Sequence, residues 1–176
     1  MTRKRVVLSL LVLGGLLAFA APLYSHCEIP CGIYDDRLRM KLIDEHVGTI
    51  EKSMKQIAEL SKAGEKNYNQ IVRWVANKDQ HADEIQHIVT QYFMTQRVKP
   101  ADPADGAKHQ KYVAQLTLLH RMLVTAMKCK QTTDPAHVEA LRKLAGQFRA
   151  AYFEASAGSA HSHAVEHSVA GDAPGR

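Results

Sequence analysis

Three potential metal ligands lie close together near the N-terminal end of the 176-residue chain. His26, Cys27 and Cys31 place one imidazole and two thiols within six residues. Thiolates are soft ligands that favour copper, zinc, nickel or iron–sulfur centres. If the chain is cut between Ser25 and His26, the new N-terminus adds a free amine beside these side chains. The pattern therefore predicts a redox-metal site at the start of a processed chain.

The donor atoms of this segment suit a square-planar ion. A terminal amine combined with a deprotonated backbone amide favours Ni(II) or Cu(II). In a chain that begins at His26, the amine, the amide nitrogen of Cys27 and the Cys27 thiolate would form two fused chelate rings. The Cys31 thiolate could close the fourth corner, because Pro30 and Gly32 can bend the chain back. The His26 imidazole would remain free as an axial ligand.

Residues 1–25 have the pattern of a cleavable export signal. Three basic residues precede an uncharged, mostly apolar run that ends at Leu23, and the small Ser25 precedes the expected cut. Cleavage after Ala20 or Ala21 is an alternative. We therefore expect an exported protein, periplasmic or extracellular, that needs a processing protease. The alternatives are a cytoplasmic protein whose leader is a propeptide and a membrane-anchored precursor, since the apolar run is nearly long enough to span a bilayer.

The charge of the chain gives no sign of a nucleic-acid partner. Three of the 23 lysines and arginines, but none of the 18 acidic residues, lie in the leader, so cleavage lowers the formal net charge from +5 to about +2. The remaining basic residues are interspersed with acidic ones, and no aromatic residues accompany them in a basic platform. We therefore expect no binding to nucleic acid.

Apolar residues recur at steps of three and four in four segments of the remaining chain, which is the spacing of amphipathic helices. The segments run from Leu38 to Ile57, from Tyr68 to Tyr92, from Tyr112 to Ala126 and from Val138 to Tyr152. Prolines and glycines lie between them, and the cap-like Asp134 precedes Pro135. No strand pattern competes. We therefore expect an all-α fold, an antiparallel four-helix bundle over residues 35–155 that follows an N-terminal hook at residues 26–34.

Residues 156–176 are rich in alanine, glycine, serine and histidine and contain almost no large apolar residue. This composition predicts a disordered tail. His161, His163 and His167 could bind a divalent metal there, but nothing rigid sets a geometry, so we interpret them as solvated side chains. Cys129 stands alone on an apolar helix face, and we interpret it as a small core residue.

Cys27 and Cys31 also have alternative interpretations. A structural zinc site normally needs a second pair of cysteines or histidines at matched spacing, and none follows. A disulfide between the two cysteines is a stronger alternative, since export favours oxidation, but it leaves the adjacent His26 unexplained. The alternative functions are an exported nickel- or copper-binding bundle, such as a metallochaperone without catalysis, and a structural bundle closed by a disulfide.

The nine residues from His26 to Tyr34 read His-Cys-Glu-Ile-Pro-Cys-Gly-Ile-Tyr. This segment closely resembles the nickel-hook motif of nickel superoxide dismutases, His-Cys-x-x-Pro-Cys-Gly-x-Tyr. The stretch Lys78–Pro100 is also similar to that family. The resemblance covers roughly Cys27 to Cys129 and continues weakly into the last helix. A chance match to this motif, combined with a helical bundle and a cleavable leader, is improbable.

The resemblance implies a site in which the His26 amine, the Cys27 amide and thiolate, and the Cys31 thiolate hold a nickel ion. The His26 imidazole would join as an axial ligand in the oxidised state. Tyr34 matches the family's active-site tyrosine, which closes the space near the metal and orders small anions or water. Tyr92 resembles the second tyrosine near the site. Tyr34 and Tyr92 are therefore the candidate catalytic residues.

The chain departs from better-known members of the family around the axial imidazole. Glu28 occupies a position where many members have aspartate. The glutamate that helps to hold the imidazole in those members falls near Leu42 to Glu45, and His81 stands where their arginine would be. The group bonded to the second ring nitrogen usually orients a metal-bound histidine. The partner of the His26 imidazole is therefore not identified by the resemblance.

The resemblance implies a nickel-dependent superoxide dismutase, an oxidoreductase that converts superoxide to O2 and H2O2. Two thiolates and an anionic amide would bring the Ni(III)/Ni(II) couple between the two half-reactions of superoxide. One superoxide would reduce Ni(III) and leave as O2, and a second would reoxidise Ni(II) and leave, with two protons, as H2O2. The resemblance also implies a homohexamer of bundles. The uncleaved precursor should be inactive, because it lacks a free amine at His26.

Overall fold

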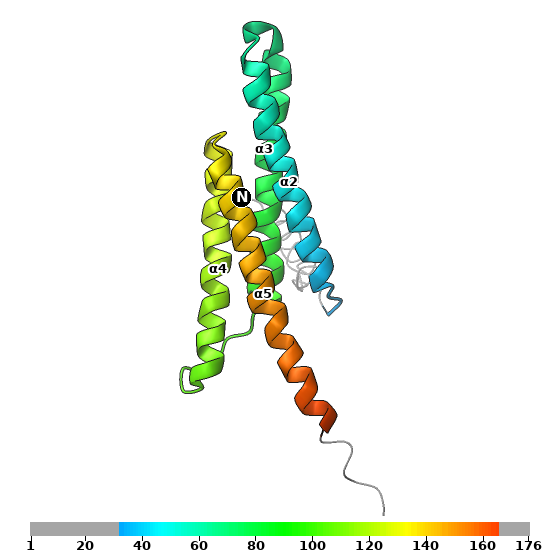
Figure 1. The fold of residues 1–176 in the computed structure, drawn as a ribbon, viewed down its shortest axis with the longest axis vertical. Coiled ribbons are helices and arrows are strands. Elements are labelled where there is room, and N and C mark those ends of the chain that lie inside the picture. The colour runs from blue at the N-terminus through cyan, green and yellow to red at the C-terminus, as the bar shows by residue number, and fades with distance from the viewer. Residues whose placement is uncertain (1–31, 166–176) are drawn as a thin grey trace, which may run out of the picture. The chain divides into compact units, whose positions relative to one another are not determined.

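The structure, a computed structural model, describes residues 32–165 of the chain, and all regular secondary structure in these residues is helical. Four long helices alternate in direction along the bundle (Figure 1). They are α2 (Asp36–Ser61), α3 (Tyr68–His87), α4 (Gly106–Gln131) and α5 (Pro135–Val165). A short 3₁₀ helix, η1 (Gly64–Asn67), joins α2 to α3, and a π-helix, η2 (Ile88–Arg97), continues α3. The all-α prediction is confirmed for this part of the chain, whereas the leader and residues 26–31 lie outside it.

Aspartates fix the first turns of three helices. The Asp35 side chain accepts a hydrogen bond of 2.9 Å from the backbone N–H of Leu38 and so caps α2. Asp105 caps α4 in the same way. Asp134 accepts from Ala136 at 2.9 Å, directly before α5, which begins at Pro135. These contacts satisfy N–H groups that have no partner within the helix. The last helix begins at the position that the sequence predicts, directly after Asp134.

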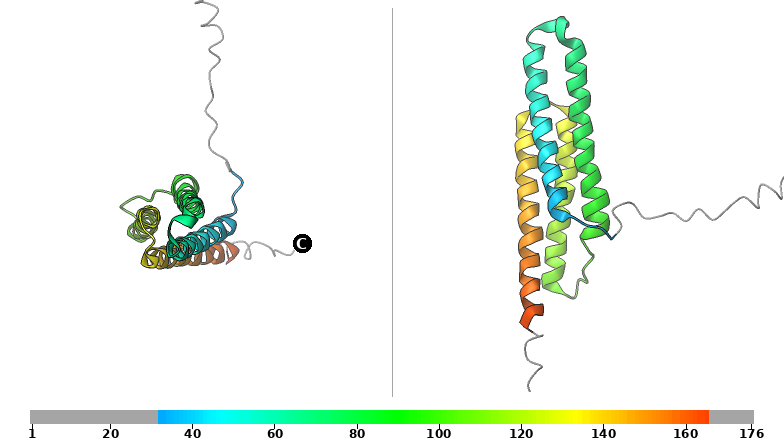
Figure 2. Two further views of the ribbon diagram at one scale, coloured as in Figure 1. Left: turned by 90° about the horizontal axis from the view of Figure 1, so that it is seen from above. Right: turned by 90° about the vertical axis from the view of Figure 1, so that its right-hand side faces the viewer.

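The hairpin of α2 and α3 extends beyond the hairpin of α4 and α5 at the end where η1 lies (Figures 1 and 2). The predicted apolar stripe of the second helix includes Tyr68 and Val75, but these side chains are 59% and 37% exposed. Val72 between them is 66% exposed. The stripe becomes buried only where α4 packs against α3. Its periodicity therefore predicts a helix correctly but does not show where the partner helices end.

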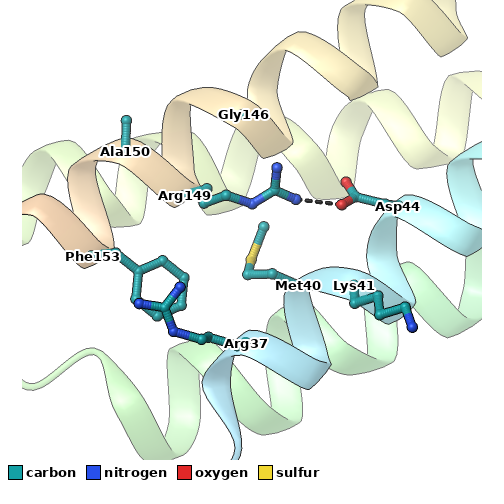
Figure 3. A pocket seen from close by; sticks show the side chains of 8 residues that line it. All are labelled: Arg37, Met40, Lys41, Asp44, Gly146, Arg149, Ala150 and Phe153. Atoms are coloured by element: carbon teal, nitrogen blue, oxygen red, sulfur yellow. Dashed lines mark hydrogen bonds and ion pairs between the residues drawn. The ribbon is translucent and has the colours of Figure 1, made fainter.

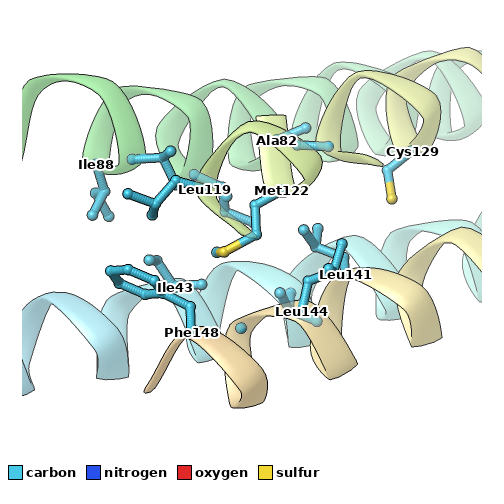
Figure 4. Packing of buried hydrophobic residues seen from close by; sticks show 14 of the residues in the cluster. Ile43, Ala82, Ile88, Leu119, Met122, Cys129, Leu141, Leu144 and Phe148 are labelled. Carbon is cyan, nitrogen blue, oxygen red and sulfur yellow. The ribbon is translucent and has the colours of Figure 1, made fainter. Parts of the chain in front are cut away.

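The hydrophobic core fills the space between all four helices. Figure 4 shows Ile43 from α2, Ala82 from α3, Met122 from α4 and Phe148 from α5 meeting in one cluster. Cys129 lies in the same cluster and is fully buried, which confirms its interpretation as a core residue. Burial raises the pKa of the Cys129 thiol to about 11. This thiol is therefore protonated at neutral pH and is a poor metal ligand.

Lys78 is the one lysine buried within the described bundle, with a side chain only 3% exposed. Its Nζ donates to the backbone carbonyls of Cys129 at 2.8 Å and Lys130 at 2.6 Å, and to Asp79 at 2.7 Å. The two carbonyls belong to the last turn of α4, where C=O groups lack intrahelical partners and carry partial negative charge. Lys78 on α3 therefore caps the C-terminus of α4, and this explains why a lysine interrupts an apolar stripe.

Replacing Lys78 by methionine is expected to lower the free energy of unfolding by about 1–3 kcal/mol, because two buried carbonyls lose their donor. The measurement is urea unfolding followed by far-UV circular dichroism. Lys55→Met is the matched control, since the Lys55 side chain is 70% exposed and its replacement should change stability by no more than about 0.5 kcal/mol. Equal stability of the two variants would contradict the capping role.

Helix α5 continues past the position at which we expected a tail to begin. The expected tail starts at residue 156, whereas α5 runs to Val165. Residues 154–165 include four alanines, and alanine has the highest helix propensity. Residues 166–176, which include His167, lie outside the described part. None of the helices among residues 32–165 is long and apolar enough to cross a membrane.

Candidate active site

The hook enters the described structure through its last three residues. The proposed ligands His26, Cys27 and Cys31 lie outside the described residues. Gly32 has a φ of 81°, a left-handed conformation that glycine adopts without strain. A turn at this position fits the sequence-based expectation that the chain bends back next to Cys31. Tyr34, two residues further along, contacts Tyr92 of the bundle.

Tyr34 and Tyr92 lie together, although 58 positions separate them in the sequence. Their ring centroids are 5.9 Å apart and the ring planes meet at 76°, an edge-to-face arrangement that aromatic pairs favour. The Arg97 guanidinium carbon lies 4.3 Å from the centre of the Tyr34 ring. Tyr92 is 3% exposed, whereas Tyr34 is 39% exposed. The two candidate tyrosines thus form one aromatic pair, in which Tyr34 is the more exposed member.

Asp36, in the first turn of α2, forms hydrogen bonds with residues of two other elements, η2 and α5. Its Oδ1 accepts hydrogen bonds from the Tyr92 hydroxyl at 2.6 Å and from Arg97 Nε at 2.8 Å. Its Oδ2 accepts from Arg97 Nη2 at 2.8 Å and from the Tyr152 hydroxyl at 2.8 Å. The arginine contact is bidentate, the strongest geometry of a carboxylate–guanidinium pair. Asp36 therefore ties the start of α2 to η2 and to α5.

This arrangement changes the acidity of its members. Burial alone would raise the pKa of Asp36, but the hydrogen bonds from Arg97, Tyr92 and Tyr152 outweigh it and hold that pKa below its usual value. Burial and the hydrogen bond to Asp36 raise the pKa of Tyr92. The same two causes raise the pKa of Tyr152 to about 12. At neutral pH the cluster consists of a carboxylate, a guanidinium and two neutral phenols.

The π-helix η2 explains how Tyr92 and Arg97 both reach Asp36. Residues five positions apart lie about 140° apart around an α-helix, but a π-helix closes its turns with bonds between such residues. Within η2, the N–H of Val98 donates to the carbonyl of Phe93 at 2.8 Å. The wider turn brings Tyr92 and Arg97 toward one side. Helical segments of this kind are rare and are often found at functional sites.

Asp36, Arg97 and Tyr152 are residues of this cluster that the sequence analysis missed. Asp36 follows Asp35 and looks like part of a helix cap, while Tyr152 belongs to a predicted core stripe. The bonds of Asp36 span 61 residues to Arg97 and 116 residues to Tyr152. The one available signal was Arg97, a cation at the end of an apolar stripe, and its partner could not be inferred from spacing.

A groove of about 620 Å³ lies beside the cluster, between the η2–α4 connection, α4 and α5. Its lining includes Arg97, Lys99 and Lys111 together with Tyr152. Lys99 and Lys111 have no carboxylate within ion-pair distance among the described residues. Unpaired cations in a groove attract small anions by long-range electrostatics. This side of the cluster is therefore suited to the approach of a small anion.

Residues 20–156, most of the chain, match the family model described as nickel-containing superoxide dismutase. The chain belongs to this family. It is a nickel-dependent superoxide dismutase, an oxidoreductase that converts superoxide to O2 and H2O2, and nickel is its cofactor. The recognition made from the hook motif is thereby confirmed. No curated protein and no solved structure matches the chain significantly.

The bundle of this dismutase holds no second candidate for a metal site in the part that the structure describes. No three side chains of histidine, cysteine, aspartate or glutamate come together there in a way that could hold a metal ion. The donor set that the sequence predicts for the hook would fit nickel, because two thiolates and two nitrogen donors suit a square-planar ion. The Gly32 turn next to Cys31 is compatible with that donor set folding on itself.

His81 of α3, for which the resemblance suggests the place of an arginine in better-known family members, is paired with His46 of α2. The two Nδ1 atoms are 2.8 Å apart, and the ring centroids are 5.0 Å apart. One ring must donate and the other must accept, so the pair disfavours double protonation. Burial first, and then the proximity of His81, lower the pKa of His46. His81 thus contacts α2, and in the described residues its Nδ1 is already occupied.

A second groove lies between α2 and α5 (Figure 3). Its volume is about 460 Å³, and Met40 lies at its centre. Arg149 on α5 forms an ion pair with Asp44 on α2 across it. The Arg37 guanidinium lies 5.0 Å from the centre of the Phe153 ring. These two contacts hold α5 against the first turns of α2, the helix that follows the hook.

Proposed function

We propose that the His26 amine and imidazole, the Cys27 amide and thiolate, and the Cys31 thiolate would hold the nickel ion of the dismutase. The observation that carries this proposal is the hook motif in a chain of the nickel-containing superoxide dismutase family. The Gly32 turn and the packing of Tyr34 against Arg97 support it. When bound, nickel supplies the one-electron oxidation and reduction that superoxide dismutation requires.

In this proposal Tyr34 limits the space next to the hook and orders superoxide or water there. Its ring is held by contacts with Tyr92 and Arg97, so the position of its hydroxyl is fixed by the bundle. Lys99 and Lys111 add positive charge on the same end of the molecule. Superoxide is anionic, and positive charge raises the rate at which it encounters the site.

Replacing Cys27 or Cys31 by serine is expected to abolish nickel binding and dismutase activity, because a serine hydroxyl is a hard ligand that stays protonated. Nickel content and superoxide decay are measured on the processed chain. Cys129→Ala is the matched control, since Cys129 is buried in the core, and this variant should retain its nickel. A serine variant that binds nickel stoichiometrically would refute the ligand assignment, as would a Cys27–Cys31 disulfide found in active enzyme by thiol counting.

We further propose that the enzyme is exported after a protease removes residues 1–25 and that it assembles as a homohexamer. The basic and apolar pattern of the leader supports export, and the resemblance to the family supports the hexamer. Mass spectrometry of the mature N-terminus and sedimentation of the loaded enzyme test these points. A mature chain that begins at a residue other than His26 would exclude the proposed ligand set, and a monomeric active enzyme would exclude the hexamer.

A further inference from the structure

The cluster at Asp36 contains more hydrogen bonds than a helix cap requires. Two tyrosine hydroxyls and two nitrogens of Arg97 donate to its two oxygens, at distances of 2.6–2.8 Å. The Asp36 side chain is 16% exposed, and these four donors match the roughly four lone-pair sites of a carboxylate. A carboxylate with four donors is held in one orientation, and it holds each donor in turn.

The hydrogen-bond direction at Tyr92 follows from the charge of Asp36. A carboxylate can only accept hydrogen bonds, so the Tyr92 hydroxyl must donate its proton to Oδ1. Tyr92 is also 3% exposed. Its proton is therefore directed at the Asp36 carboxylate and is not offered to solvent.

Tyr34 is placed differently. Its ring lies over the Arg97 guanidinium at 4.3 Å and against the Tyr92 ring at 5.9 Å. Its hydroxyl makes no hydrogen bond to another residue of the described part, and the residue is 39% exposed. Both groups that position the Tyr34 ring are themselves bonded to Asp36.

We propose that Asp36 is a positioning residue that holds Tyr92 and Arg97 as a support, so that of the two candidate tyrosines only Tyr34 presents its hydroxyl to superoxide. The inference rests on the proposed position of the hook. It assigns different roles to two residues that the sequence analysis treated alike. Tyr152 takes part by occupying the second oxygen of Asp36.

Asp36→Asn is the variant that tests this role most directly. Asparagine has the same shape, but one of its two polar groups is an NH2 donor. In either orientation that NH2 group would face donors, namely Arg97 with one of the two tyrosine hydroxyls. The substitution therefore opens the cluster without removing volume from the bundle.

The first readout is the titration of individual tyrosines in the full-length, nickel-free chain. It uses NMR of tyrosine labelled at the ring carbon that bears the hydroxyl. At about pH 11 an unperturbed phenol is mostly ionised, whereas Tyr92 and Tyr152 of the unmodified chain should remain neutral. In Asp36→Asn both should ionise at a lower pH than in the unmodified chain, because the contribution of the carboxylate is lost while that of burial remains. In Tyr152→Phe, Tyr92 should remain protected, because Oδ1 keeps its carboxylate character.

The second readout is kinetic and uses the nickel-loaded enzyme. Tyr34→Phe should lower kcat by about a hundredfold, the size of a lost proton-handling group. Tyr92→Phe keeps the supporting ring and should lower kcat by no more than about fivefold. Asp36→Asn should lower kcat by about tenfold, with KM little changed, because it displaces the support. Tyr68→Phe, on the exposed part of α3, is the control and should leave kcat unchanged.

Either readout can overturn the proposal. It is wrong if Tyr92 of the unmodified chain ionises like an exposed phenol, or if Tyr92→Phe loses as much kcat as Tyr34→Phe. If Asp36→Asn fails to fold, the comparison of Tyr34→Phe with Tyr92→Phe still decides. The tyrosine titration needs no nickel, so a failure of the hook assignment, seen as nickel retention by Cys27→Ser, is distinguishable from a failure of this inference.

Discussion

One extra alanine before His26 in the mature chain is expected to abolish dismutase activity. The addition converts the amine of His26 into a peptide amide and moves the new amine away from the Cys27 thiolate. Replacing a group that only supports a metal ligand costs about 10- to 100-fold in affinity or activity, so the loss of a ligand should cost at least a hundredfold. Superoxide decay and nickel content, both measured on purified protein, check this expectation.

The matched control carries the same alanine after Arg176, at the other end of the chain. It should bind nickel and dismute superoxide like the unmodified enzyme. Both variants should give the same far-UV circular dichroism, because the first helix of the described residues begins at Asp36, ten residues after the altered terminus. Full activity of the variant extended before His26 would show that the free amine is not a ligand, and the expectation of an inactive precursor would then be unfounded.

The helical fold could be predicted because its determinants are local. The step of three and four between apolar residues defines each helix, and Asp134 with Pro135 defines the start of α5. What could not be predicted is how far one helix covers another. Tyr68 and Val75 belong to a regular apolar stripe but are exposed, because the α4–α5 hairpin does not reach them. Helix length alone does not fix the overlap of two hairpins.

The candidate site likewise has one part that depends on residues close together in the sequence and one part that depends on residues far apart. The hook ligands and Tyr34 lie within nine residues, so a motif contains them all. The Asp36 cluster depends on contacts with Arg97 and Tyr152 over 61 and 116 residues. It also depends on a π-helix that changes which side chains share a face. A prediction from the spacing of apolar residues assumes a constant number of residues per turn. It fails in a π-helix, where each turn contains more residues.

Phe93 belongs to the hydrophobic core and also contacts residues of the Asp36 cluster. This side chain is fully buried in η2. Its ring centroid is 5.1 Å from that of Tyr92, 5.0 Å from that of Phe148 and 5.6 Å from that of Tyr152, each in an edge-to-face contact. Two of these three neighbours donate hydrogen bonds to Asp36. Phe93 therefore supports the cluster from the side of the core.

Phe93→Ala is expected to lower the free energy of unfolding by about 3–5 kcal/mol, because it leaves a cavity and removes three aromatic contacts. Single domains are stable by only about 5–15 kcal/mol, so the variant should be close to unfolding at physiological temperature. Urea unfolding of the nickel-free chain measures the loss. Tyr68→Ala is the matched control, since Tyr68 is 59% exposed and its replacement should cost about 0.5 kcal/mol or less. A loss for Phe93→Ala below about 1 kcal/mol, no larger than an average substitution, would mean that neighbouring side chains refill the space and that the cluster does not depend on this ring.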